Sequence, residues 1–153
     1  MKAEIINPFL AASLNLFRDF LGVSASNSSP YVLKDSQDLA EVSAIIGLAG
    51  DTTGAVVLSF SRETAIAMVS RLSGKTYSAL TNEVLDGVGE MVNIIAGNAK
   101  KDLAGFRILI SLPGVVVGAS YKIRWPEGIP VIAIPFQSEA GPFSVNVSLH
   151  DAV

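Results

Sequence analysis

The stretch from Thr81 to Gly105 reads T-N-E-V-L-D-G-V-G-E-M-V-N-I-I-A-G-N-A-K-K-D-L-A-G. It predicts one long helix, because Thr81 can cap the amino-terminal end and Gly105 is placed to end it. Apolar residues recur along the stretch at spacings of three and four, which is typical of a helix with one buried side. These residues are Leu85, Val88, Val92, Ile95, Ala99 and Leu103. We expect this helix to organise the rest of the chain.

A second stripe with the same spacing consists of Asp86, Glu90, Asn93 and Gly97. At about 100° per residue, it points about 150° away from the apolar stripe. Two carboxylates, a carboxamide and a bare backbone position therefore face solvent. Ile94 lies on the same exposed side, where a polar residue is expected.

This composition does not favour helix stability. Asn93 and Asn98 are poor interior residues, because an asparagine side chain competes for backbone hydrogen bonds. Gly87, Gly89 and Gly97 each cost about 1 kcal/mol relative to alanine. The simplest interpretation is a solvent-exposed helix face with ordinary polar residues. The composition nevertheless indicates that something other than helix stability selects these residues.

Four segments in the same order resemble a known family. They are I-N-P-F-L at residues 6–10, I-I-G-L-A-G-D-T-T-G-A-V-V-L-S-F at 45–60, the acidic-x3-Glu-x2-Asn pattern with I-I-A-G-N-A-K and then I-S-L-P at 86–113, and I-P-F at 134–136. Together they are similar to the CheC/CheX/FliY phosphatases of bacterial and archaeal chemotaxis, and the CheX branch fits best. The isolated acidic-x3-Glu-x2-Asn pattern is weakly specific, whereas the ordered set is much more so.

The resemblance implies a partner, the phosphorylated receiver protein CheY, with its phosphoaspartate and bound Mg²⁺. It implies that Asn93 orients the attacking water and that Glu90 pairs with the active-site lysine of the receiver. Asp86, Ile94 and Gly97 are then expected to dock the partner. The chain itself is expected to need no cofactor and no metal.

The resemblance also implies a homodimer in which two sheets join edge to edge. We expect the exposed strands near the carboxyl terminus to provide that edge, because unpaired strand edges invite pairing.

Length and composition agree with one soluble domain over residues 1–153, since 50% of the residues are apolar. No apolar run approaches the length of a membrane span, so we expect no membrane insertion. A net charge of −3 with scattered basic residues argues against nucleic acid as a partner. The absence of cysteine and of a signal-peptide pattern fits a cytoplasmic protein.

The rest of the chain predicts an α+β fold, with three helices packed on a largely antiparallel sheet. Asn7 and Pro8 suit the cap and first position of a helix that ends near Leu21. On that interpretation Glu4 and Asn7 share no helix face, although their spacing repeats that of Glu90 and Asn93. Residues 131–135 and 143–149 predict a final hairpin whose second strand has one solvated face.

Other functions stay open at this level. The chain could be a non-enzymatic receiver-binding or flagellar-switch-type adaptor, or a structural dimerisation domain. An independent small-molecule hydrolase is the least favoured class, because the single histidine, His150, has no partners nearby in sequence for a triad or metal cluster.

Overall fold

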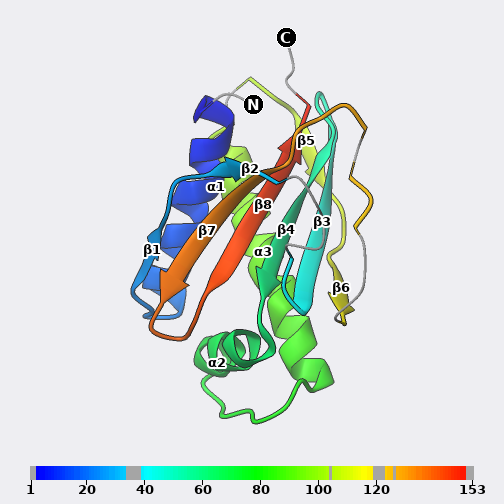
Figure 1. The fold of residues 1–153 in the computed structure, drawn as a ribbon. Helices are drawn as coiled ribbons and strands as arrows, with labels where there is room; N and C mark the ends of the chain where they lie inside the picture. The colour runs from blue at the N-terminus through cyan, green and yellow to red at the C-terminus, as the bar shows by residue number, and fades with distance from the viewer. Residues whose placement is uncertain (1–2, 34–38, 104, 119–122, 126, 151–153) are drawn as a thin grey trace.

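The computed structural model describes residues 3–33, 39–103, 105–118, 123–125 and 127–150. Two helices, α1 and α3, lie side by side against one face of an antiparallel sheet, and a third, α2, crosses one end of it (Figure 1). This is the α+β arrangement that the sequence predicts. Within the described residues, no helix has both the length and the apolar character needed to cross a bilayer.

The strands form one sheet with the order β1-β7-β8-β4-β3-β5, in which β2 also pairs with β7 and β6 with β3. Every pairing among the described strands is antiparallel. The strands are β1 (Ala25–Asn27), β2 (Tyr31–Val32), β3 (Val42–Gly50), β4 (Gly54–Phe60), β5 (Ile108–Ile110), β6 (Gly114–Val117), β7 (Ile132–Ser138) and β8 (Phe143–Leu149).

Helix α1 (Ala3–Asn15) begins earlier than the sequence predicts and continues into a π-helical turn, η1 (Leu16–Phe20). Pro8 therefore lies inside the helix rather than at its first turn, so the prediction that Asn7 caps it is wrong. A proline lacks the N–H that would bond the carbonyl four residues earlier, here that of Glu4. Glu4 is exposed, so water can satisfy this carbonyl, and the buried Ile5 and Ile6 stabilise the additional turn.

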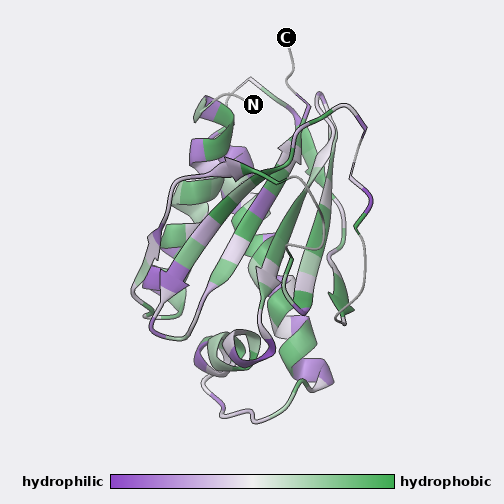
Figure 2. Cartoon of the chain, viewed as in Figure 1, coloured by the Kyte–Doolittle hydropathy of each residue, from purple (hydrophilic) through white to green (hydrophobic). Residues whose placement is uncertain are grey.

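The other two helices have clear caps. Helix α2 (Arg62–Ser73) begins after Ser61, whose hydroxyl accepts a hydrogen bond from the Thr64 N–H at 3.2 Å. Helix α3 (Asn82–Lys101) begins after Thr81, as predicted, and the Thr81 hydroxyl accepts from the Val84 N–H at 3.2 Å. Hydrophilic residues gather on α2 and at the amino-terminal end of α3 (Figure 2).

The core fills the space between the helices and the sheet. Four phenylalanines join η1 to three central strands, and Phe136 stacks on Phe143 with ring centroids 4.8 Å apart. Phe17 of η1 lies 4.3 Å from Phe143 between centroids, and Phe60 of β4 lies 5.5 Å from it. Each buried ring removes about 150–250 Å² from water, so these side chains contribute strongly to the core.

The opposite face of β8 is not solvated, so that prediction is wrong. Asn146 and Ser148 on this face are buried. Asn146 is paired in register with Ala133 of β7, which forms a small apolar cluster with Leu33, and Leu39 and Trp125 pack against this cluster. Segments outside the sheet therefore cover this part of it, and alternation along one strand cannot reveal such a cover.

The carboxyl-terminal strands are not sheet edges either. Strand β8 lies between β7 and β4, and β7 lies between β8 and the short strands β1 and β2. The second edge is formed by β5 and β6, which follow one another along β3. An edge-to-edge contact must therefore use residues 25–32 or 108–117 rather than the last hairpin.

Candidate functional site

The candidate site is the exposed side of α3. Its opposite side is buried through Val84, Val88, Met91, Val92, Ile95, Ala96 and Ala99. The helix packs against α1, α2 and the sheet, and its last turn is tied to β5 by a hydrogen bond from Lys100 Nζ to the Ile108 carbonyl, 3.2 Å. The side that faces solvent is therefore carried by a helix fixed along its whole length.

The residues predicted for the site do lie on this exposed side. Asp86 and Glu90 are exposed, whereas Asn93, Ile94 and Gly97 are half-buried. Among the described residues, no hydrogen bond or ion pair engages the side chain of Asp86, Glu90 or Asn93. Their carboxylate and amide groups are thus available to a partner.

The three glycines of α3 have different explanations. A Cβ on Gly87 would lie 2.6 Å from Val69 Cγ1, so α2 packs too closely there for any side chain. A Cβ on Gly89 would make ordinary contact with Pro113 and Val115 at 3.6 Å. A Cβ on Gly97 would meet nothing within 4 Å, so packing inside this chain does not require a glycine there. Packing therefore explains the glycine at Gly87 alone, and Gly97 is the position where an added side chain would meet open space.

The connection between β5 and β6 packs beside the site, a contact that the sequence did not indicate. Pro113 in this connection packs on α3 at Gly89, the residue before Glu90. Asn93 lies one helical turn beyond Gly89 on the same side of the helix, because residues four apart stack along a face. The neighbouring Leu112 is 92% exposed. The sequence does not show which strand packs beside α3, so it does not reveal this contact.

Glu4 and Asn7 repeat the Glu-x2-Asn spacing on α1, and both are exposed. Because α1 extends through Pro8, the two residues share a helix face, contrary to the prediction. We assign the candidate site to α3 because there the pair belongs to the longer stripe that runs from Asp86 to Gly97. In α1, the position four after the asparagine is Ala11, whereas α3 has Gly97.

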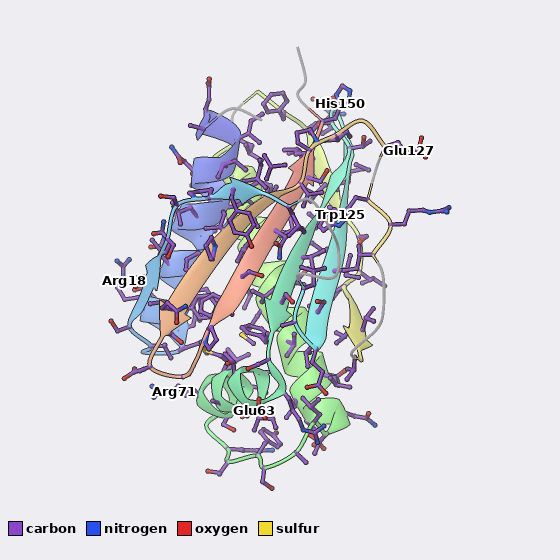
Figure 3. The ribbon with its side chains drawn as sticks, in the orientation of Figure 1. Arg18, Glu63, Arg71, Trp125, Glu127 and His150 are labelled. Carbon is purple, nitrogen blue, oxygen red and sulfur yellow. The ribbon has the colours of Figure 1, made fainter. Side chains whose placement is uncertain are left out.

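The remaining chemistry of the chain lies elsewhere. His150 is exposed at one end of the molecule, while Glu63 and Arg71 lie at the other end on α2 (Figure 3). No group of three or more His, Cys, Asp and Glu side chains in the described part of the chain is placed to hold a metal ion. Three surface hollows, of about 430, 290 and 170 Å³, are lined by other elements than α3. The polar stripe of α3 thus lies outside these three hollows and presents its side chains to solvent, where another protein can reach them.

Comparison with known proteins identifies the family. Residues 42–137 match the family model described as chemotaxis phosphatase CheX. The chain is 31% identical over 127 residues to the CheY-P phosphatase CheX of Thermotoga maritima, covering 81% of this chain and 82% of that protein.

Solved structures agree in fold. A chemotaxis protein CheX from Desulfovibrio desulfuricans is 32% identical with a TM-score of 0.87, over 96% of this chain and 99% of that one. A complex of CheX with CheY, BeF3 and Mg²⁺ from Borrelia burgdorferi contains a chain that is 28% identical with a TM-score of 0.81, over 98% of this chain and 100% of that one. The chain with the exposed Asp86-x3-Glu90-x2-Asn93 stripe therefore belongs to the CheX family of chemotaxis phosphatases.

Proposed function

We propose that this chain is a phosphatase for the aspartyl phosphate of CheY, with Glu90 and Asn93 on α3 as its functional pair. The relative from Thermotoga maritima is a CheY-P phosphatase, and the Borrelia burgdorferi structure is a complex of CheX with CheY. One observation carries the assignment to residues: in this family member, Glu90 and Asn93 stand side by side on a rigid helix and have no partner among the described residues.

The reaction is hydrolysis of a phosphoryl group carried by a receiver aspartate. Water attacks the phosphorus in line with the bond to the aspartate oxygen, that bond breaks, and inorganic phosphate and free aspartate result. Such transfers depend mainly on positioning and charge stabilisation, so a group that orients the water is sufficient to accelerate them. The Asn93 amide can accept a hydrogen bond from the water through its oxygen and donate one through its nitrogen.

Glu90 binds the receiver, whereas Asn93 orients the water. Its carboxylate lies one helical turn from Asn93 and pairs with the active-site lysine of the receiver, which docks and aims the helix. Asp86, one turn further on, and the small Gly97 at the other end are assigned to docking, as is the half-buried Ile94. Each of these roles depends on the receiver approaching α3 along its exposed side.

The proposal also covers the metal ion, the extent of the domain and the cellular compartment. The Mg²⁺ of the Borrelia burgdorferi complex is assigned to the CheY partner, and this chain supplies no cofactor of its own. Residues 1–153 form a single CheX-like domain, as the one main core shared by the helices and the sheet supports. The domain meets its receiver in the cytoplasm.

We also propose a homodimer. Both sheet edges expose large apolar side chains, Tyr31 and Val32 on β2 and Leu109 and Val117 on β5 and β6, the latter two 62% and 43% accessible. We propose the edge of β5 and β6. An edge that presents both unpaired backbone groups and apolar side chains is suited to pairing with a second sheet. This edge replaces the carboxyl-terminal strands that the sequence suggested.

The test is the rate of phosphate loss from a phosphorylated CheY with Mg²⁺, with and without this protein. Asn93→Ala is expected to lower the stimulated rate about 100-fold, because loss of positioning costs about that factor, while binding to CheY stays close to wild type. Asn98→Ala is the matched control: Asn98 is also half-buried on α3 but lies about 140° around the helix from Asn93.

Three outcomes can be told apart. A rate that falls in Asn93→Ala and not in Asn98→Ala supports the assignment. Equal rates in Asn93→Ala and wild type would remove Asn93 from the chemistry. Binding of CheY without any acceleration by the wild-type chain would instead favour the adaptor function.

A further inference from the structure

Leu112 is the most exposed of the large apolar residues in the described part of the chain, at 92%. It lies between β5 and β6, where residues 111–113 stand opposite only residues 46 and 47 of β3, as in a β-bulge at a sheet edge. Exposing a whole leucine side chain contributes nothing to the core. A contact with another molecule would give it a role.

The connection that carries Leu112 is held in place on both sides. The Ser111 N–H donates to the Gly47 carbonyl at 2.9 Å, and the Gly47 N–H donates to Ser111 Oγ at 2.8 Å. Ser111 Oγ also donates to the Leu112 carbonyl at 3.0 Å. On the other side, Pro113 packs on α3 at Gly89. Leu112 therefore projects from a fixed backbone, which lowers the entropy cost of a contact.

The position of Pro113 sets the location of Leu112 relative to the proposed site. Gly89 directly precedes Glu90, and Asn93 follows Gly89 by one helical turn on the same side. Leu112 directly precedes Pro113 in the chain, so it lies near this part of α3, on the side of the sheet edge. Ile94 lies on the other side of the pair, about 40° around the helix from Glu90. Two apolar side chains flank a polar centre, an arrangement that excludes water around the central contacts of an interface.

We infer that Leu112 is a docking residue for the phosphorylated receiver and sets the affinity for it, while taking no part in the hydrolysis. The inference rests on the proposed function, because the receiver occupies the Leu112 surface by continuing from the Glu90 and Asn93 pair. A second copy of this chain is the competing occupant, since Leu112 belongs to the same sheet edge as Leu109 and Val117.

Leu109 offers a matched control on that edge. It is paired in register with Ala49, and it is 62% exposed. Its neighbours Ile108 and Ile110 pack with the core on the helix side, so alternation places Leu109 on the opposite side of the sheet from α3. Leu109→Ala removes the same atoms from the same edge without touching the proposed receiver surface.

The experiment compares Leu112→Ala, Leu112→Met and Leu109→Ala with wild type in steady-state dephosphorylation of CheY-P. It also compares their binding to CheY loaded with BeF3 and Mg²⁺, their melting temperatures and their masses by light scattering. We expect Leu112→Ala to raise both KM and Kd about tenfold, the effect of truncating one apolar anchor. Its kcat, melting temperature and mass should stay at wild-type values, and Leu112→Met should restore the affinity, because methionine has a similar volume.

An unchanged KM in Leu112→Ala, or an equal rise in Leu109→Ala, overturns the inference. A smaller mass with unchanged KM shows that Leu112 contacts a second copy instead. Failure of the proposed catalytic pair gives a different pattern: Asn93→Ala would keep its full kcat while Leu112→Ala still weakened binding. If wild type neither binds nor dephosphorylates CheY, both proposals are wrong.

Discussion

The same substitution, glycine to alanine, is expected to have opposite effects on stability at two positions of α3. At Gly97, an added Cβ meets nothing within 4 Å. The substitution then contributes only the higher helix propensity of alanine, about 1 kcal/mol of added stability. At Gly87 the same gain in propensity is available, but the added Cβ lies 2.6 Å from Val69 Cγ1 and 2.9 Å from Cγ2.

Val69 cannot easily move away. It is 2% exposed in the contact between α2 and α3, and a β-branched side chain in a helix has one strongly preferred rotamer. Overpacking of this kind costs about 1–3 kcal/mol, which exceeds the gain in propensity. We therefore expect Gly87→Ala to lower the free energy of unfolding by about 1 kcal/mol. The two variants should differ by about 2 kcal/mol, or about 4–8 °C in melting temperature for a chain of this length.

Thermal and urea unfolding of both variants at one protein concentration measures this difference. If Gly87→Ala stabilises the protein as much as Gly97→Ala does, the close contact between α2 and α3 is not the reason for the glycine. The stabilised Gly97→Ala variant also tests function. If the receiver backbone approaches α3 at this position, the variant should be more stable than wild type and yet bind CheY more weakly.

Two further predictions concern partners. Glu90→Gln removes a charge but little volume, so it should weaken binding of CheY loaded with BeF3 and Mg²⁺ by about tenfold. At high salt, the affinities of the variant and the wild type should differ much less. Glu83→Gln is the control, because Glu83 is exposed two turns earlier on the same helix, and equal effects of the two substitutions would contradict a specific ion pair. Val117→Lys places a charge on the exposed β6 edge, which blocks strand pairing. Light scattering at micromolar concentration should then give the mass of one chain in place of two, while an unchanged dimer would exclude this edge.

The elements that the sequence predicted well carry redundant local signals. Helix α3 has a capping threonine, a long apolar period and a basic last turn, and all of these agree about where it lies. Its exposed stripe follows directly from the period, so Glu90 and Asn93 could be placed on one face without any tertiary information. The fold class followed for the same reason, because the order of helices and strands is itself local.

The predictions that were wrong depended on tertiary contacts. Pro8 lies inside α1 because the apolar residues before it, Ile5 and Ile6, are buried against the rest of the chain, which outweighs the cost of proline. Asn146 is buried because Trp125 and Leu39 cover the neighbouring part of the sheet. In each case a local rule was overridden by burial that only the folded chain creates.

Gly87 and Gly97 differ in the space around an added Cβ, and this difference bears on the function of α3. The sequence alone indicates that both glycines serve function at the expense of helix stability. The structure explains Gly87 by packing against α2 and leaves Gly97 without a structural reason, beside Asn93 and Ile94 on the exposed face. A residue that costs helix stability and improves no internal contact is expected to be kept for a contact outside the chain. We therefore propose that the exposed face of α3 is half of a catalytic surface, which becomes an active site only against the receiver that carries the phosphate.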